Sequence, residues 1–186
     1  MPAKELLIMA QYNHMITLDF KPLQETDLPL LFSWLALPHV ATWWRETRDY
    51  EKFAAKYREY IAIDDVGPFI IYHHQTPIGY ISWADTATDP TRPEQHPAGT
   101  YGMDLFIANL DYLGKGYGVT LIKQFLQTIL MPKHPFKIII DPEITNVRAI
   151  HVYERVGFKK TAIVQTTDGT TLITAQLMEL DPKMSK

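Results

Sequence analysis

Apolar and polar positions alternate along some stretches of this chain and recur at helical spacing along others. Alternation predicts strands at residues 16–20, 69–73, 78–83 and 101–107, and an unbroken apolar run predicts a buried strand at 137–140. Apolar residues three and four positions apart predict helices at 25–37 and 49–61, then one that ends near residue 130 and one at 146–156. The tail from 158 to 180 predicts a hairpin folded about Asp168-Gly169.

This order of elements, β-α-α-β-β-β-α-β-α-β-β, predicts one mixed α/β domain, which we place at residues 15–182. Residues 1–14 are expected to form a poorly ordered leader. Their apolar run, Leu6–Ala10, is shorter than the core of a signal peptide and follows no basic region. No stretch approaches the roughly 20 apolar residues of a membrane span, so we expect a cytoplasmic protein without a membrane partner. Edge strands of the hairpin allow either a monomer or a homodimer.

Composition removes several classes of function. The chain of 186 residues has no cysteine, which excludes disulfides, thiolate metal sites and a cysteine nucleophile. A formal net charge of −3 gives no basic excess for nucleic acid. The sequence contains neither a His-x-x-x-His pair nor an acidic cluster that would suggest a metal site. His73 and His74 are expected to point to opposite faces of a strand, so they would not bind one metal together. The charged runs Lys56–Glu59 and Lys159-Lys160 are expected to be solvated faces.

The most specific local feature is the glycine-rich turn Leu113–Gly118, between a predicted strand and a predicted helix. Glycines let a ligand approach the backbone, and the first amides of a helix favour an anion such as a pyrophosphate. The spacing fits neither a Walker loop nor the dinucleotide fingerprint, because Val119 stands at the third glycine position. Taken alone, the turn is equally compatible with a tight connection that binds nothing.

A second block, Asn146–Phe158, has the pattern Asn-x-x-Ala-x-x-x-Tyr-Glu-x-x-Gly-Phe. Together the two blocks resemble the GNAT superfamily of N-acetyltransferases. The resemblance implies a central, mostly antiparallel sheet of six to seven strands flanked by about four helices, with acetyl-coenzyme A as co-substrate and no metal. The family pattern has Arg or Gln where this chain has Leu113. By resemblance, the cofactor-binding residues are Leu105, Phe106, Ile107, Leu113, Gly114, Lys115, Gly116, Tyr117, Gly118, Val119, Asn146, Ala149 and Tyr153.

Two residues are candidates for the chemistry. Tyr153 falls on the family's motif tyrosine and is expected to protonate the leaving thiolate; the alternative is a tyrosine that only packs under the cofactor. Asp104 is a charge among apolar strand neighbours, which indicates a cleft, where it would anchor a cationic substrate and relay its proton. The alternative for Asp104 is a buried ion pair, for example with Arg148.

Further segments are similar to aminoglycoside 6′-N-acetyltransferases over nearly the whole length. They include Val40-x-x-Trp43-Trp44, Pro77–Tyr80, Gly102-x-Asp104 and Asp141-Pro142. The resemblance implies a small polycationic acceptor whose binding residues are Trp43, Trp44, Tyr80, Asp104 and Asp141. Trp43-Trp44 as a structural pair and Asp141 as a turn residue remain alternatives, and the long irregular loop 84–99 is expected to set specificity.

Three other functions stay open at this point. A sister group in siderophore synthesis acylates hydroxylamines, but it tends to carry a histidine where this chain has Asp104. A protein or peptide N-acetyltransferase would need the long loop to form an open groove. A coenzyme A-binding sensor without activity would keep the glycine turn but has little reason to keep Asp104 and Tyr153 together.

Overall fold

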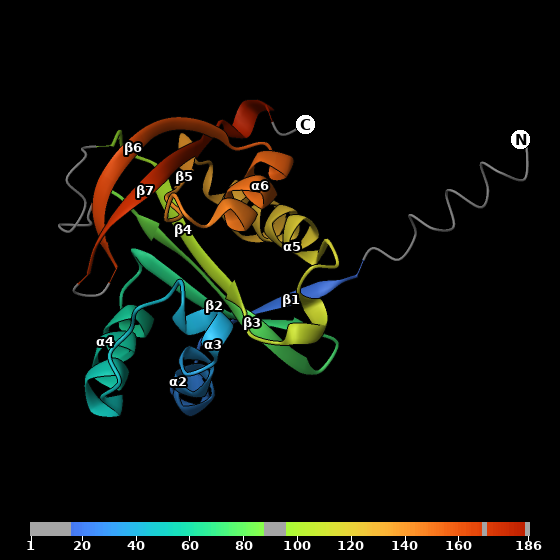
Figure 1. Cartoon of the computed structure of the whole chain (residues 1–186). Helices are drawn as coiled ribbons and strands as arrows, with labels where there is room; N and C mark the ends of the chain where they lie inside the picture. The colour runs from blue at the N-terminus through green and yellow to red at the C-terminus, as the bar shows by residue number, and fades with distance from the viewer. Residues whose placement is uncertain (1–15, 88–95, 169–170, 185–186) are drawn as a thin grey trace, which may run out of the picture.

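A seven-stranded sheet runs through the molecule in the order β1-β2-β3-β4-β5-β7-β6 (Figure 1). The computed structural model describes residues 16–87, 96–168 and 171–184. The strands are β1 (Leu18–Pro22), β2 (Val66–His73), β3 (Thr76–Asp85), β4 (Thr100–Ile107), β5 (Lys137–Ile140), β6 (Lys159–Asp168) and β7 (Thr171–Leu180). Every neighbouring pair is antiparallel except β4 and β5, which are parallel. The predicted fold class, a mixed α/β fold with a mostly antiparallel sheet, is confirmed.

Helices cover both faces of this sheet, with α2, α3 and α4 on one side and α5 and α6 on the other (Figure 1). They are α2 (Leu28–Leu35), α3 (Pro38–Ala41), α4 (Tyr50–Ala62), α5 (Tyr117–Phe125) and α6 (Val147–Val156). Shorter helical turns are η1 (Glu25–Asp27), η2 (Leu110–Tyr112), η3 (Leu126–Leu130, a π-helical turn), η4 (Met131–Lys133) and η5 (Pro182–Met184).

Two hydrophobic cores result from these two layers. Central strand β3 contributes to both: Ile81 and Trp83 join the core under α5 and α6, whereas Tyr80 joins the core under α2 and α4. Six successive positions of β3 are buried, because a strand covered on both faces needs apolar residues in both directions. The sheet is therefore fixed from both sides at the strands that lead to the site.

Local side chains explain where the helices begin and end. The Asp49 carboxylate accepts hydrogen bonds from the amides of Glu51 and Lys52 at 3.0 and 3.3 Å and so begins α4. The Asn146 side chain accepts the Ala149 amide at 3.2 Å and begins α6, and Gly157, at φ +123°, ends it. These predicted helix boundaries are confirmed.

Two local details differ from the sequence interpretation. The first predicted helix ends at Leu35, and Pro38 does not only stop it but also begins the short α3, because the first turn of a helix does not need the missing N–H. The expectation that His73 and His74 point to opposite faces was wrong. His74 lies in the turn after β2 at φ +56°, and the two rings lie 4.2 Å apart.

The parallel neighbours β4 and β5 separate soon after they meet. Their pairing covers only Thr100, Tyr101 and Gly102 of β4, although β4 continues to Ile107 and pairs with β3 along that length. In an antiparallel pair, alternate amides of a strand point away from its partner. Alternate amides of β4 beyond Gly102 therefore point into the gap between the separating strands.

Some predictions lie outside the described residues: the leader at 1–14, the part of the long loop at 88–95 and Gly169 of the hairpin turn. Within the ranges that the structure describes, no helix is long and apolar enough to cross a membrane.

Candidate active site

A cleft of about 920 Å³ lies where β4 and β5 separate. Its walls come from the segment between α3 and α4, the ends of β4 and β5, the glycine turn before α5, one face of α6 and the end of β6. One continuous cavity thus reaches from the glycine turn to the predicted acceptor residues.

The glycine turn has the geometry of an anion site. Gly114 and Gly116 adopt φ +77° and +84°, a region that favours glycine, and Gly116 is the residue before the first turn of α5. The first amides of α5 have no helical acceptor of their own, so this end of the cleft attracts negative charge. A phosphate-bearing cofactor fits this arrangement.

The third glycine serves packing between helices. A Cβ on Gly118 would lie 3.3 Å from Cγ1 of Val152 on α6, a tight contact, so glycine eases the close approach of α5 to α6. Opposite the turn, a Cβ on Gly114 would lie 3.4 Å from Nη2 of Arg148, which places the guanidinium at the anion site. Sequence reasoning had offered Arg148 only as an ion-pair partner of Asp104.

The other predicted cofactor residues divide into two groups. Those that line the cleft are Leu105, Phe106, Ile107, Leu113, Gly114, Gly116, Tyr117, Gly118, Asn146, Ala149 and Tyr153. Lys115 and Val119 do not line it, and Lys115 is exposed. Any contribution of Lys115, in the turn, and of Val119, in α5, to cofactor binding would therefore come through the backbone.

The predicted catalytic residues come together in the middle of the cleft. Asp104 is exposed on β4 and lines the cavity, as the cleft interpretation expects. Tyr153 reaches the same cavity from α6 and is 8% exposed. Asp141, just after β5, also lines it. Three residues that are up to 49 positions apart in the sequence therefore surround one volume.

Electrostatics keep the Tyr153 phenol protonated. Burial raises its pKa well above the ordinary value for tyrosine, and the carboxylates of Asp104 and Asp141 raise it further. The phenol can thus donate a proton at any physiological pH. The same shift makes donation to a thiolate more uphill than it would be for a free phenol, whose pKa of about 10 already exceeds the thiol value of about 8.5.

The two tryptophans have different environments. Trp44 packs edge-on against Tyr80 and Phe106, with ring centroids 5.6 and 5.0 Å apart. Trp43 is 40% exposed, and both tryptophans line the cleft. Tyr80 is only 1% exposed and stacks on Phe106 at 5.7 Å. Trp43 is therefore the more exposed of the two tryptophans in the cleft, whereas Trp44 packs on Tyr80 and Phe106.

The expectation that Lys56–Glu59 is a solvated face was wrong for Tyr57, and it missed a specific partner of Lys56, whose side chain is 41% exposed. Tyr57 is 1% exposed, and Lys56 lines the cleft, where its ammonium lies 2.7 Å from the carboxylate of Glu46. Burial, the largest single effect, lowers the pKa of Lys56, but the hydrogen bond to Glu46 and the neighbouring negative charges together outweigh it, so the pKa of Lys56 is raised overall. The negative field of Asp104 adds to the same effect.

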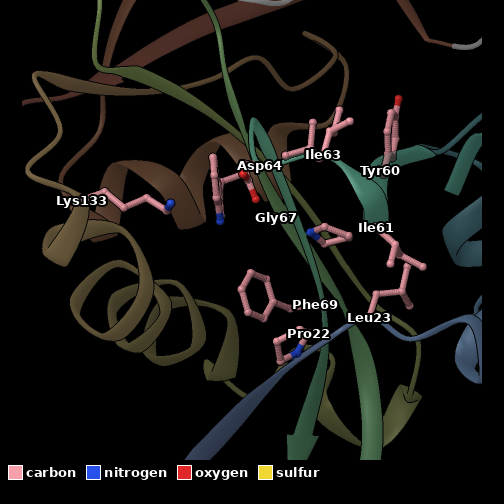
Figure 2. Close-up of a pocket in the computed structure, with 12 residues that line it drawn as sticks. Pro22, Leu23, Tyr60, Ile61, Ile63, Asp64, Gly67, Phe69 and Lys133 are labelled. Carbon is pink, nitrogen blue, oxygen red and sulfur yellow. The ribbon is translucent and has the colours of Figure 1, made fainter. Parts of the chain in front are cut away.

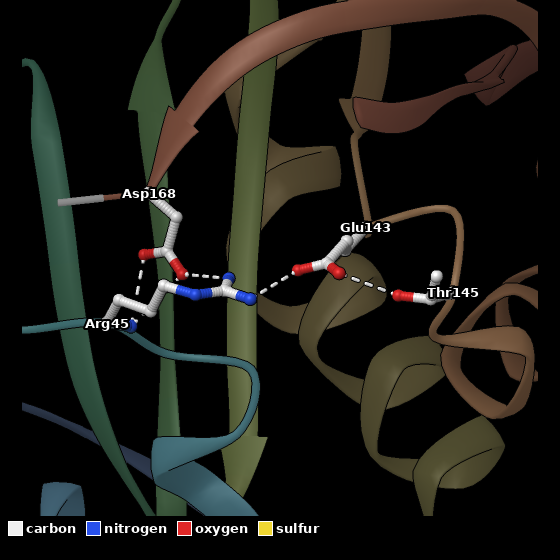
Figure 3. Close-up of polar contacts among 4 residues, drawn as sticks. All are labelled: Arg45, Glu143, Thr145 and Asp168. Carbon is white, nitrogen blue, oxygen red and sulfur yellow. Dashed lines mark hydrogen bonds and ion pairs between the residues drawn. The ribbon is translucent and has the colours of Figure 1, made fainter. Parts of the chain in front are cut away.

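Sequence reasoning also missed an ion-pair network at the rim of the cleft. Arg45 lies between Glu143 and Asp168, which line the same cavity (Figure 3). Only the position of Arg45 directly after Trp43-Trp44 connects it with the predicted acceptor residues in the sequence.

A smaller cavity of about 420 Å³ lies elsewhere, beside the end of α4 and β2 (Figure 2). Ile61 and Ile63 line it, and Lys133 reaches over the ring of Trp83 with its Nζ 3.8 Å from the centroid. None of the predicted site residues lines this cavity, so the chemistry belongs to the larger cleft.

Comparison with known proteins agrees with this geometry. Residues 24–166 match the family model described as "Acetyltransferase (GNAT) domain". Aminoglycoside N(6′)-acetyltransferase type 1 from Klebsiella pneumoniae is 30% identical over 183 residues, which cover 91% of this chain and 86% of the relative. The relative of the same name from Serratia marcescens matches equally.

Solved structures of aminoglycoside acetyltransferase AAC(6′)-Ib have the same fold. The complex with coenzyme A has a TM-score of 0.79 at 28% identity and covers 90% of this chain and 96% of that chain. The complex with coenzyme A and kanamycin has a TM-score of 0.78 at 29% identity, with the same coverage. The chain therefore belongs to the GNAT family and is an acetyl-coenzyme A-dependent N-acetyltransferase.

Proposed function

We propose that this enzyme transfers the acetyl group of acetyl-coenzyme A to a primary amine of a small polycationic molecule, and that this amine is the 6′-amine of an aminoglycoside. The observation that carries the proposal is the single cleft, which joins an anion site at the glycine turn to the carboxylates of Asp104 and Asp141 past Tyr153. An acceptor with several ammonium groups complements those carboxylates. The names of the 30% identical relatives support the aminoglycoside as the acceptor.

At the cofactor end, the backbone does most of the binding. The amides from Gly114 to Gly118 and the N-terminus of α5 would hold the pyrophosphate, and the Arg148 guanidinium adds a cation beside Gly114. Bound acetyl-coenzyme A supplies an acetyl thioester. An amide of β4 within Leu105–Ile107 would orient the thioester carbonyl, because β4 has no strand neighbour on that side.

At the acceptor end, two groups handle protons. Asp104 anchors the acceptor ammonium and relays its proton to solvent, which leaves the neutral amine that attacks. As the new C–N bond forms and the C–S bond breaks, Tyr153 gives its proton to the thiolate. The proton lost by the acetylated nitrogen restores Tyr153 through solvent. Each turnover releases one proton overall.

Residues 15–182 act as one acetyltransferase domain. The enzyme works in the cytoplasm, where acetyl-coenzyme A is available, as a monomer or homodimer, and binds neither nucleic acid nor membrane. Trp43 and Asp141 bind the acceptor with Asp104, and Trp44 and Tyr80, which pack on each other, complete the aromatic wall of the cleft.

The test is a thiol-release assay with two matched aminoglycosides, one with a 6′-amine and one with a 6′-hydroxyl. Release of coenzyme A with the amine and none with the hydroxyl would establish the reaction and its position. Polyamines, a hydroxylamine and a short peptide serve as competing acceptor classes. Rapid release with one of these and none with either aminoglycoside would overturn the proposed acceptor, whereas cofactor binding without any release would overturn the proposed catalysis.

A further inference from the structure

The Arg45 guanidinium is held by two carboxylates that come from distant parts of the chain. Its Nη2 donates to Glu143 at 2.7 Å, and its Nη1 donates to Asp168 at 3.0 Å (Figure 3). The three side chains are 31%, 21% and 23% exposed, so the network lies at the rim of the cleft, neither fully buried nor free in solvent. All three residues line the cavity that holds the predicted acceptor residues.

The carboxylates do not depend on this guanidinium for their positions. The backbone amide of Arg45 itself donates to both oxygens of Asp168, at 3.2 and 3.0 Å. Glu143 accepts a hydrogen bond from the Thr145 hydroxyl at 2.7 Å, and its backbone forms a bridge with Ala175 of β7. Contacts other than the Arg45 guanidinium thus help to keep both acids in place around it.

Two neighbouring groups stabilise the ionised form of Glu143. The Thr145 hydroxyl, and after it the Arg45 guanidinium, lower the pKa of Glu143 below its ordinary value. Two ionised carboxylates around one guanidinium leave an excess of one negative charge. Glu143 and Asp168 thus resemble a binding site for a cation, and the guanidinium of Arg45 occupies it.

The site lies at the acceptor end of the cleft. Arg45 directly follows Trp43-Trp44, and Glu143 lies two positions after Asp141. A polycationic acceptor held at Asp104 and Asp141 would direct its remaining ammonium groups toward further carboxylates along the same wall. There it would meet two acids that already hold a cation.

We propose that Arg45 is a specificity-determining residue, an internal cation that fills the Glu143–Asp168 site and so limits how many positive charges an acceptor can bring into the cleft. This inference rests on the proposed function, because it takes the acceptor to be a polycation. An acceptor with few ammonium groups leaves the network intact, whereas a highly charged one must share or displace the guanidinium.

The test compares Arg45→Gln with wild type for amines of different charge. Equilibrium affinities of a tetra-amine and a diamine are measured by calorimetry on the coenzyme A complex at low ionic strength, so the result does not depend on turnover. Arg45→Gln should raise the preference for the tetra-amine over the diamine by about fivefold, the size expected for a partly exposed ion pair. Added salt should shrink this gain, since screening weakens it.

Two further variants isolate the cause. Arg58→Gln removes the same charge from an exposed pair with Glu25, 2.7 Å apart and outside the cleft, and should leave the preference at the wild-type value. Arg45→Lys keeps the cation and should stay near wild type. An unchanged preference in Arg45→Gln, or an equal loss of affinity for both amines, would overturn the inference. Wild-type protein that binds neither amine would instead contradict the proposed function.

Discussion

Replacing Tyr153 by phenylalanine removes one hydroxyl from the centre of the cleft and keeps the ring. That ring is 8% exposed and packs edge-on against Phe158, with centroids 6.1 Å apart. Phenylalanine preserves this packing, so the free energy of unfolding should change by about 1 kcal/mol or less, the net value of one hydrogen bond. The variant therefore separates chemistry from folding.

The size of the kinetic effect follows from the pKa of the donor. General acid catalysis contributes roughly 10²–10⁴-fold to a rate. Burial, and then the Asp104 and Asp141 carboxylates, raise the pKa of Tyr153, which widens its gap to the thiol and weakens its driving force as an acid. We therefore expect kcat to fall toward the lower end of that range, by about 100-fold, which corresponds to roughly 3 kcal/mol in the barrier.

The assay is thiol release at saturating acetyl-coenzyme A and acceptor, combined with thermal unfolding of each variant. Tyr101→Phe is the matched control, because Tyr101 packs on Trp83 at 5.4 Å and does not line the cleft. Tyr101→Phe should retain wild-type kcat. If Tyr153→Phe also keeps its kcat while folding normally, Tyr153 is not the proton donor, and the reasoning from its position in the cleft is refuted.

Three more predictions test the cofactor end, the acceptor end and the buried tyrosines. Asp104→Asn should lower kcat/KM for the acceptor by about 100-fold, as for the loss of a charged hydrogen bond of 1.5–3 kcal/mol, with the Kd of coenzyme A measured as the control. Gly116→Ala and Gly99→Ala each force alanine to positive φ and should cost about 1 kcal/mol of stability, but calorimetry should show weaker coenzyme A binding only for Gly116→Ala. Burial raises the folded pKa of Tyr80 and Tyr153 above the unfolded value near 10, so their stabilisation is complete below pH 10 and is lost as pH rises beyond it. Urea midpoints should fall above pH 10, and less steeply in Tyr80→Phe.

Elements defined by local chemistry could be predicted from the sequence. Asn146 and Gly157 mark the two ends of α6 through contacts within three or four residues, and Asp49 begins α4 in the same way. The strand at Lys137–Ile140 has the predicted bounds, because a short, unbroken apolar run in a mixed α/β fold is typical of a buried central strand. The inclusion of His74 in the turn was not predicted, because positive φ is uncommon for residues other than glycine.

The two ends of the cleft differ in how they could be predicted. The cofactor end depends on backbone conformations that few residues tolerate, so Gly114 and Gly116 reveal it within one short segment. The acceptor end depends on side chains paired across the fold: Arg45 and Asp168 are 123 positions apart, and nothing near either residue identifies the partner. The contact of Lys56 with Glu46 was missed for a similar reason, because Glu46 lies in the segment before α4 and nothing in the sequence pairs the two residues. A motif can thus identify the reaction, but acceptor preference is set by pairs such as Arg45–Asp168 that lie outside every motif, and relatives that share the glycine turn are free to differ in the amines they accept.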